Sequence, residues 1–494
     1  MLFRFLLCWV LAAAPAWAQT FDPNRPFSPE QLQSDFRLLR QALEEGHPGL
    51  YWYETKATMD SAFALTARQL DRPMNEEQYR KHLSPLIARI HCGHTGVFLS
   101  KRAERVFKKN RPPLLPFETG FYSGKLYIIQ NHSSDSTLRA GTELLAIEGE
   151  PVERISRLMR ALIPSDGYNQ TFKNVRISGS FPGYYRLLYG QRDTVSISVR
   201  DSAGVVKALR LAPVSPQPFR VLPKVTAQPA PNTPQSKPRR ADRNHTLQFS
   251  ERDSSVALLT VYTFDEQRYG RFYRRAFREI ERRGCTNLIL SIRANGGGYS
   301  AAGRKLLSYL IDSTFRFTQS MVAPKKRLSF GKHLNNKPLR FFVRNFFSKG
   351  RADGMLELRS GDEITRPSKR YHFNGSVYAL TNGGTFSAAA IVATNLQARQ
   401  RATLIGRETG GGRAGCNAAY IPFLTLPETR VRIRFPLYRV LTDVPTPNEG
   451  RGVRPDFEVN YAIQDVLKNR DLDVEKAFDL IEERRKKSRE TTQK

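Results

Sequence analysis

The sequence predicts a multidomain protein with an α/β layer in its second half, because three different residue patterns follow one another along the chain. Residues 19–108 show mainly helical spacing, and residues 112–213 show short alternating strands. From Thr246 onward strands alternate with amphipathic helices, which is typical of an α/β layer fold. The predicted segments are a signal peptide (1–18), a helical domain (19–108), a β-rich module (112–213), a Pro-rich linker (214–246), an α/β domain (247–465) and a C-terminal helix with a basic tail (466–494).

The first 18 residues have the pattern of a secretory signal peptide. A positive start and an apolar run precede Ala16-Trp17-Ala18, a small-x-small cleavage site. The apolar run is shorter than the roughly 20 residues that a membrane span needs. We therefore expect export to the periplasm or the extracellular side of the envelope. Three cysteines remain after cleavage, too few for a disulfide framework.

The chain is strongly basic, with a formal net charge of +32. This charge favours acidic partners, and in an exported protein anionic envelope surfaces are the expected ones. A nucleic acid would need a recognisable binding module, and the sequence contains none. We expect no nucleic acid and no cofactor.

The helical domain begins at Ser28, which with Gln31 forms a capping box around Pro29. Its first helix is expected to end near Gly46. Further helical patterns continue to Ile90, followed by a loop of small and polar residues, His91-Cys-Gly-His-Thr-Gly96.

The α/β domain is expected to contain buried strands at 256–261, 287–292 and from Val377. A basic, aromatic insertion lies between about 320 and 360, and we expect it to form a solvated flap. The linker before this domain contains seven prolines, which suit an extended spacer.

Ser387 is the candidate nucleophile. It follows an apolar strand and a turn of small residues, Thr385-Phe-Ser-Ala-Ala389, which would present its hydroxyl at the start of a helix. A second strand ends in Asn295-Gly-Gly-Gly298, where backbone N–H groups can hold a developing oxyanion. Taken alone, Ser387 is also consistent with a simple helix N-cap.

A nucleophilic serine needs a base, and His94 is the candidate. The glycine-rich turn 406–413 offers no lysine, whereas His94 lies in a small-residue loop that can approach another domain. A surface histidine is the alternative. His91 and His94 have a metal-like spacing, but no third ligand is apparent, so no metal is expected. Glu449, in a Gly/Pro-rich loop, is a candidate to orient the base or to cap a turn.

Together these segments resemble the C-terminal processing and tricorn-core peptidases, a serine peptidase family with a crotonase-like α/β catalytic domain. The resemblance rests on Arg293-Ala-Asn-Gly-Gly-Gly298, within the strand that begins at Leu290, and on the Ser387 turn Thr385-Phe-Ser-Ala-Ala389. It implies that Ser387 attacks the scissile carbonyl while the N–H groups of Gly297 and Ala388 hold the oxyanion.

The same resemblance bears on the base and on the β-rich module. In the lysine-dependent branch of the family, the base would fall at the position of Gly412. The His94 loop is similar instead to the histidine segment of the tricorn-like branch. In that branch a serine often precedes the histidine, whereas this chain has Gly93 at that position. A carboxylate of that branch maps onto Glu449. The module at 112–213 resembles a PDZ domain, without a clear carboxylate-binding loop.

The leading hypothesis is therefore an exported serine endopeptidase, for which protein or peptide substrates are expected. The alternatives are a non-catalytic binding protein for peptides or apolar ligands on the same fold, and an envelope esterase or amidase that uses the same nucleophile.

Overall fold

The computed structural model describes residues 21–215, 245–265, 268–324, 327–360, 363–444 and 449–492. The predicted signal peptide and nearly all of the predicted linker lie outside the described residues. Within those ranges no helix combines the length and apolarity needed to cross a membrane.

The N-terminal region is a small group of helices that ends in one short strand. Its elements are α1 (Pro29–Gly46), α2 (Lys56–Arg68), α3 (Glu76–Arg89), β1 (Gly96–Phe98) and α4 (Lys101–Lys109). Helix α1 begins at the predicted capping box, where Ser28 and Gln31 each bond the other's backbone N–H.

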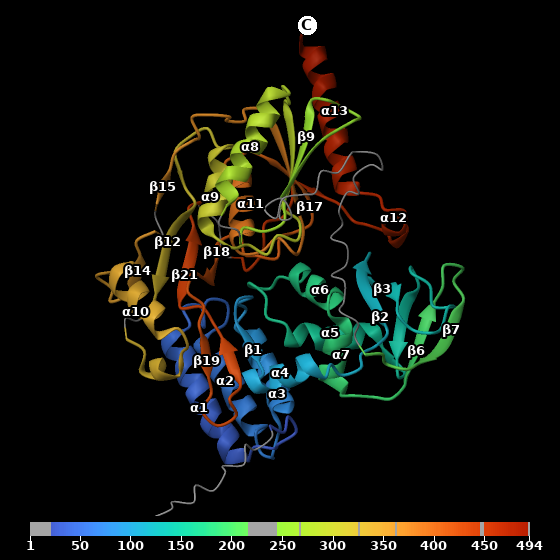
Figure 1. The fold of residues 1–494 in the computed structure, drawn as a ribbon, viewed down its shortest axis with the longest axis vertical. Coiled ribbons are helices and arrows are strands. Elements are labelled where there is room, and N and C mark those ends of the chain that lie inside the picture. The colour runs from blue at the N-terminus through green and yellow to red at the C-terminus, as the bar shows by residue number, and fades with distance from the viewer. Residues whose placement is uncertain are drawn as a thin grey trace, which may run out of the picture.

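The middle module has its own hydrophobic core. Its sheet has the order β2-β3-β4-β6-β7, and three helices pack beside it (Figure 1). The elements are β2 (Phe117–Tyr122), β3 (Lys125–Asn131), β4 (Glu143–Ile147), β5 (Glu150–Pro151), α5 (Val152–Leu162), α6 (Thr171–Ser178), α7 (Phe181–Tyr189), β6 (Val195–Arg200) and β7 (Val206–Leu211).

The α/β domain is built on a six-stranded sheet of order β22-β17-β16-β10-β9-β8, in which only β8 is antiparallel to its neighbour. The strands are β8 (His245–Phe249), β9 (Val256–Val261), β10 (Asn287–Ser291), β16 (Ser376–Thr381), β17 (Thr403–Gly406) and β22 (Phe457–Glu458). Strands β9, β10 and β16 match the predicted apolar runs, and β10 is buried throughout.

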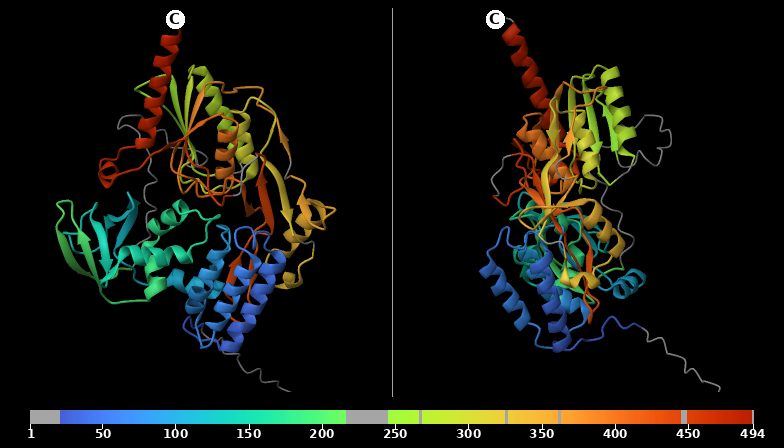
Figure 2. Two further views of the ribbon diagram at one scale, coloured as in Figure 1. Left: turned by 180° about the vertical axis from the view of Figure 1, so that it is seen from behind. Right: turned by 90° about the vertical axis from the view of Figure 1, so that its left-hand side faces the viewer.

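Helices cover both faces of this sheet (Figures 1 and 2). One face packs against α8 (Tyr269–Arg282), α9 (Ser300–Ser308) and α11 (Ala388–Ala398). The other face packs against α13 (Leu472–Thr492), through Ala477 and Ile481. Helix α12 (Ile463–Leu467) precedes α13.

Two smaller sheets extend the α/β domain toward the N-terminal helices. One has the order β13-β14-β12-β21-β18 and the other β1-β20-β19. Their strands are β12 (Thr318–Ala323), β13 (Ser348–Gly350), β14 (Leu356–Leu358), β18 (Gly415–Ala418), β19 (Phe423–Thr425), β20 (Arg432–Arg434) and β21 (Tyr438–Thr442). A two-stranded pair is formed by β11 (Phe315–Arg316) and β15 (Ile364–Thr365).

The basic insertion differs from the flap expected from the sequence. Strands β12, β13 and β14 belong to a sheet with β21, so much of the insertion is regular structure. Between these strands lie η2 (Ser329–His333) and α10 (Lys337–Phe346). Helix α10 has no buried residue.

One antiparallel pair joins the two ends of the chain. Strand β1 pairs with β20 in the register Gly96 to Arg434 and Phe98 to Arg432. The core of the N-terminal helices and that of the α/β domain form one continuous hydrophobic cluster. The loop that precedes β1, which carries His94, is thereby brought against the α/β domain.

Candidate active site

Ser387 lies at a strained turn between β16 and α11. Its backbone has φ 54° and ψ −127°, a conformation that costs a non-glycine residue about 1–3 kcal/mol unless its surroundings impose it. The surroundings do so here, since Thr385 Oγ1 donates to Ile292 O (2.9 Å) and Phe386 N donates to Asn295 O (2.9 Å). The turn is fixed to the end of the neighbouring strand β10.

The glycine-rich segment after β10 lies directly against Ser387. A Cβ added at Gly297 would lie 2.7 Å from Ser387 Cβ, so only glycine permits this approach. The two predicted oxyanion donors differ. Ala388 N, at the start of α11, has no hydrogen bond to the described residues, whereas Gly297 N donates to Asn295 Oδ1 at 2.9 Å. The expectation of a free N–H at Gly297 is therefore not met.

The structure brings His94 to Ser387. His94 Nε2 lies 3.1 Å from Ser387 Oγ, although the two residues are 293 positions apart. The imidazole packs on the ring of Phe386, with centroids 4.7 Å apart. His94 is buried, with 8% of its surface exposed.

Burial makes the His94 imidazole neutral at physiological pH. Loss of solvation, and to a smaller extent the charge of Arg434, lowers the pKa of His94 from 6.5 to about 3. A neutral imidazole has one nitrogen with a free lone pair, which can accept a proton from a hydroxyl. The 3.1 Å contact and the neutral ring thus allow His94 to accept the Ser387 proton, while burial makes it a weaker base than a solvated imidazole.

Two glycines near the base explain the two departures from the family pattern. A Cβ at Gly93 would lie 2.7 Å from the Phe386 ring, so no serine fits before His94 without a shift. A Cβ at Gly412 would lie 2.5 Å from Gly415 O, so a lysine does not fit there either. Packing at these two positions therefore leaves no room for the side chains of the other arrangements.

Asp166 is a site residue that the sequence analysis missed. It comes from the loop between α5 and α6 of the middle module, and only 2% of its surface is exposed. Its Oδ1 accepts the N–H of Gly93 at 2.9 Å, and Gly167 N donates to His91 O at 3.0 Å. Burial raises the pKa of Asp166 to about 7.

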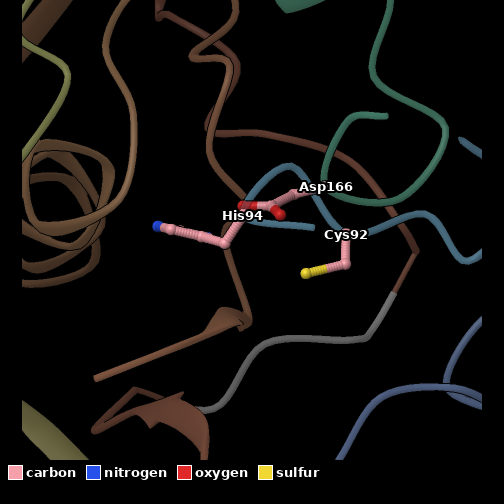
Figure 3. Close-up of side chains that lie close together, drawn as sticks. All are labelled: Cys92, His94 and Asp166. Atoms are coloured by element: carbon pink, nitrogen blue, oxygen red, sulfur yellow. The ribbon is translucent and has the colours of Figure 1, made fainter. Parts of the chain in front are cut away.

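Cys92, His94 and Asp166 form one buried cluster (Figure 3). Cys92 Sγ, a ring nitrogen of His94 and a carboxylate oxygen of Asp166 all lie within 4.8 Å of one another. His94 Nδ1 and Asp166 Oδ2 are both buried and have no hydrogen-bond partner in the described part of the chain. In Figure 3 Cys92 and His94 project from one short loop, and Asp166 approaches from another segment.

Glu449 does not take the predicted place beside the base. Its side chain is exposed and makes no hydrogen bond to His94 or to any other described residue. The carboxylate that is buried beside His94 is that of Asp166. The two loops are neighbours, because Tyr168 N donates to Gly450 O at 2.8 Å. The turn Pro164-Ser-Asp-Gly167 carries no spacing that would reveal this contact.

Comparison with known proteins identifies the α/β domain. Residues 255–459 match the model of Peptidase family S41. This region of the chain belongs to peptidase family S41. The members of this family are serine-type peptidases, and the matched region includes the Ser387 turn. No curated protein sequence matches the chain.

Solved structures resemble this chain well beyond residues 255–459. The structure of mature CPAF complexed with lactacystin has 13% sequence identity and a TM-score of 0.61, and covers 89% of this chain and 96% of its own. Mature CPAF alone has 14% sequence identity and a TM-score of 0.61, and the match covers 89% of this chain and 94% of that chain. The photosystem II D1 C-terminal processing protease has 14% sequence identity and a TM-score of 0.41, and the match covers 87% of this chain and 93% of that chain. The CPAF likeness shows a shared multidomain α/β fold.

Proposed function

We propose that this S41 chain is an exported serine endopeptidase in which His94 deprotonates Ser387. The observation that carries the proposal is the 3.1 Å contact between His94 Nε2 and Ser387 Oγ, at a serine held in a strained turn. Membership of a serine-type peptidase family supports protein or peptide substrates.

The proposed reaction follows the chemistry of acyl transfer. The Ser387 hydroxyl proton passes to His94 Nε2 as Oγ attacks the carbonyl carbon of the peptide bond. The imidazolium then gives that proton to the leaving amine, and an ester to Ser387 remains. Water, deprotonated by the same imidazole, hydrolyses the ester. The amide of Ala388 is placed to stabilise the negative oxygen.

The oxyanion site must differ in detail from the simplest family arrangement. If Gly297 N also donates to the oxyanion, its bond to Asn295 Oδ1 must open when substrate binds. A single donor typically contributes about 10²–10³ in turnover, so both amides matter to the proposal.

A fluorophosphonate probe tests the nucleophile. The wild type should become covalently labelled, and Ser387→Ala should not. Ser300→Ala is the matched control, because Ser300 also begins a helix after a glycine-rich turn. Equal labelling of wild type and Ser387→Ala would remove Ser387 from the mechanism.

Substrate assays separate the competing functions. Digestion of casein or a peptide library that depends on Ser387 supports the endopeptidase. Hydrolysis of ester or amide model compounds without peptide cleavage would favour the envelope esterase or amidase. Peptide binding without cleavage, and with no probe labelling, would favour the non-catalytic binding protein.

We also propose that the 112–213 module is a PDZ-like domain and that the catalytic domain is crotonase-like. The module's separate core and its antiparallel sheet with flanking helices support the first assignment. Helices on both faces of the parallel sheet support the second. Titration of fluorescent peptides with free and amidated C-termini tests the module, since a carboxylate-binding PDZ groove requires the free form.

Export and contact with an anionic envelope surface remain proposals that the signal-like N-terminus and the charge of +32 support. Helix α10 is a suitable contact element, because an amphipathic helix with Arg and Lys beside exposed Phe suits an interface. Its exposed apolar side chains and that of the next residue are 49–60% accessible: Leu339, Phe341, Phe342, Phe346 and Phe347.

Vesicle sedimentation tests this contact. Wild type should sediment with phosphatidylglycerol vesicles and not with phosphatidylcholine vesicles, and replacing both Phe342 and Phe346 by Ser should weaken binding. Equal binding of wild type and the double variant would exclude α10 as the contact element. Fractionation of cells that express the full chain tests export.

A further inference from the structure

The buried cluster beside the base has the composition of a metal site. Thiolate, imidazole and carboxylate are the three ligand types that zinc takes in proteins. Cys92, His94 and Asp166 supply one of each, all buried and within 4.8 Å of one another. This set differs from the His91 and His94 pair considered in the sequence analysis, for which no third ligand was apparent.

Two of the three groups have an atom left without a partner. His94 Nδ1 and Asp166 Oδ2 are buried and unbonded among the described residues, although buried polar atoms usually have partners. The other atoms of the same side chains are engaged, since Nε2 faces Ser387 and Oδ1 accepts the Gly93 N–H. Each side chain thus keeps one buried atom without a hydrogen bond, although the nearby Gly412 N–H also lowers the pKa of Asp166.

The distances and charges suit a divalent ion. Zinc bonds of about 2.0–2.3 Å place two tetrahedral ligands roughly 3.3–3.7 Å apart, so shifts of about 1 Å close the cluster around an ion. The present contact of Cys92 Sγ is weak, a 3.9 Å approach to Asn417 O. Burial raises the pKa of Cys92 to about 12, so Zn²⁺ binding must displace the thiol proton into solvent. The resulting thiolate and the Asp166 carboxylate then balance the two positive charges of the ion.

We propose that Cys92, His94 and Asp166 form a zinc-binding regulatory site, and that zinc bound there switches the peptidase off. This inference rests on the proposed function for its effect on activity. When Zn²⁺ takes the lone pair of His94 Nδ1, the neutral ring carries its proton on Nε2. Nε2 then donates to Ser387 Oγ and cannot accept the proton of the hydroxyl. Removal of zinc restores the base.

Cobalt substitution tests the site without any activity assay. Co²⁺ added to the purified metal-free protein should give the near-ultraviolet absorption of a cobalt–thiolate bond at one equivalent. Cys92→Ser should lose this absorption, and Cys285→Ser, which removes another buried free cysteine, should keep it. Absence of the band in the wild type, or its persistence in Cys92→Ser, would overturn the proposal.

Calorimetry and turnover with zinc give the functional arm. Wild type and Cys285→Ser should bind one Zn²⁺ and lose at least about 90% of their turnover. Addition of a chelator should restore the turnover. Mg²⁺ should not inhibit, because thiolate ligands select softer ions. Cys92→Ser should bind zinc at least about 10-fold more weakly and, relative to its own zinc-free turnover, be inhibited at correspondingly higher zinc.

The outcomes separate this proposal from the function on which it rests. A cobalt–thiolate band in a protein without peptidase activity would keep the site and reject the proposed function. Equal zinc inhibition of wild type and Cys92→Ser would keep the peptidase and reject the site.

Discussion

The nucleophile turn and the base loop reach the same point in different ways. The Ser387 turn is held inside one domain, by hydrogen bonds to the end of the adjacent strand β10. The His94 loop is held by three separate segments, namely β20 beyond its end, Phe386 under the imidazole and Asp166 of the middle module. The nucleophile is therefore a local feature, whereas the base depends on how the domains dock.

The difference predicts that perturbing the middle module affects only half of the site. A change at Asp166 or Gly93 should alter the position of the imidazole while the Ser387 turn keeps its geometry. Variants can be chosen to break either half.

Removal of the base should have the largest effect. We expect His94→Ala to lower turnover by about 10³-fold or more, because the hydroxyl of Ser387 then has no proton acceptor. His82→Ala, which replaces another histidine of the N-terminal helices, serves as the control. Turnover is measured with a peptide that wild type cleaves, and an unchanged rate in His94→Ala would assign the base elsewhere.

A pair of carboxylate variants tests which acidic group supports the base. We expect Asp166→Asn to lower kcat by about 10²-fold with little change in KM at pH 8, where a carboxyl group with a pKa of about 7 is ionised. The amide oxygen still accepts the Gly93 N–H, but the negative charge beside the imidazole is lost. Glu449→Gln should change kcat less than about 2-fold. A larger loss of kcat in Glu449→Gln than in Asp166→Asn would show that Glu449, the carboxylate indicated by the family pattern, supports the base.

Overpacking of the base loop should have a smaller effect. In Gly93→Ala the new methyl group meets the Phe386 ring, and such overpacking typically costs about 1–3 kcal/mol. We expect about a 10-fold loss of turnover, partly recovered by Phe386→Leu in the same chain. Gly183→Ala, where nothing lies within 4 Å of the added Cβ, is the matched control. Equal turnover in the single variant and wild type would show that the loop accommodates a side chain.

The last prediction concerns the pH dependence of the free energy of unfolding, through a histidine that contacts the base loop. His47 is buried, its Nε2 lies 2.9 Å from Thr95 Oγ1, and burial lowers its pKa to about 3. An unfolded histidine has a pKa of about 6.5, so His47 leaves stability intact above pH 6.5 and reduces it as the pH falls toward 3. At pH 5 this one histidine lowers the free energy of unfolding by about 2 kcal/mol relative to neutral pH. Urea unfolding at pH 7 and pH 5 should show that much less acid destabilisation in His47→Gln; equal destabilisation would contradict the assignment.

The sequence predicted the parts of the site that local patterns determine. An apolar strand followed by small residues indicates the Ser387 turn, and the same logic indicates β10 and its glycines. The Gly297 amide was misjudged, although the signal was present, because an asparagine two residues earlier often accepts such an N–H in an Asx turn.

The contacts that the sequence could not predict are those between separately folded regions. Asp166 lies in a loop between two helices of the middle module, and its relation to His94 exists only when that module docks. Glu449 was carried over from a pattern in its own loop, yet the structure leaves its side chain exposed. The periodicity of apolar residues predicts helices and strands, but it does not predict which carboxylate of one domain will face an imidazole of another.

The pairing of β1 with β20 also has a consequence for the newly made protein. The histidine is translated early, but the strand that seats its loop is completed only at Arg434, and the serine only at residue 387. A ribosome-bound chain with those segments still in the exit tunnel lacks both partners of the imidazole. On the proposed mechanism, the imidazole can therefore meet the serine hydroxyl only after most of the chain has been synthesised.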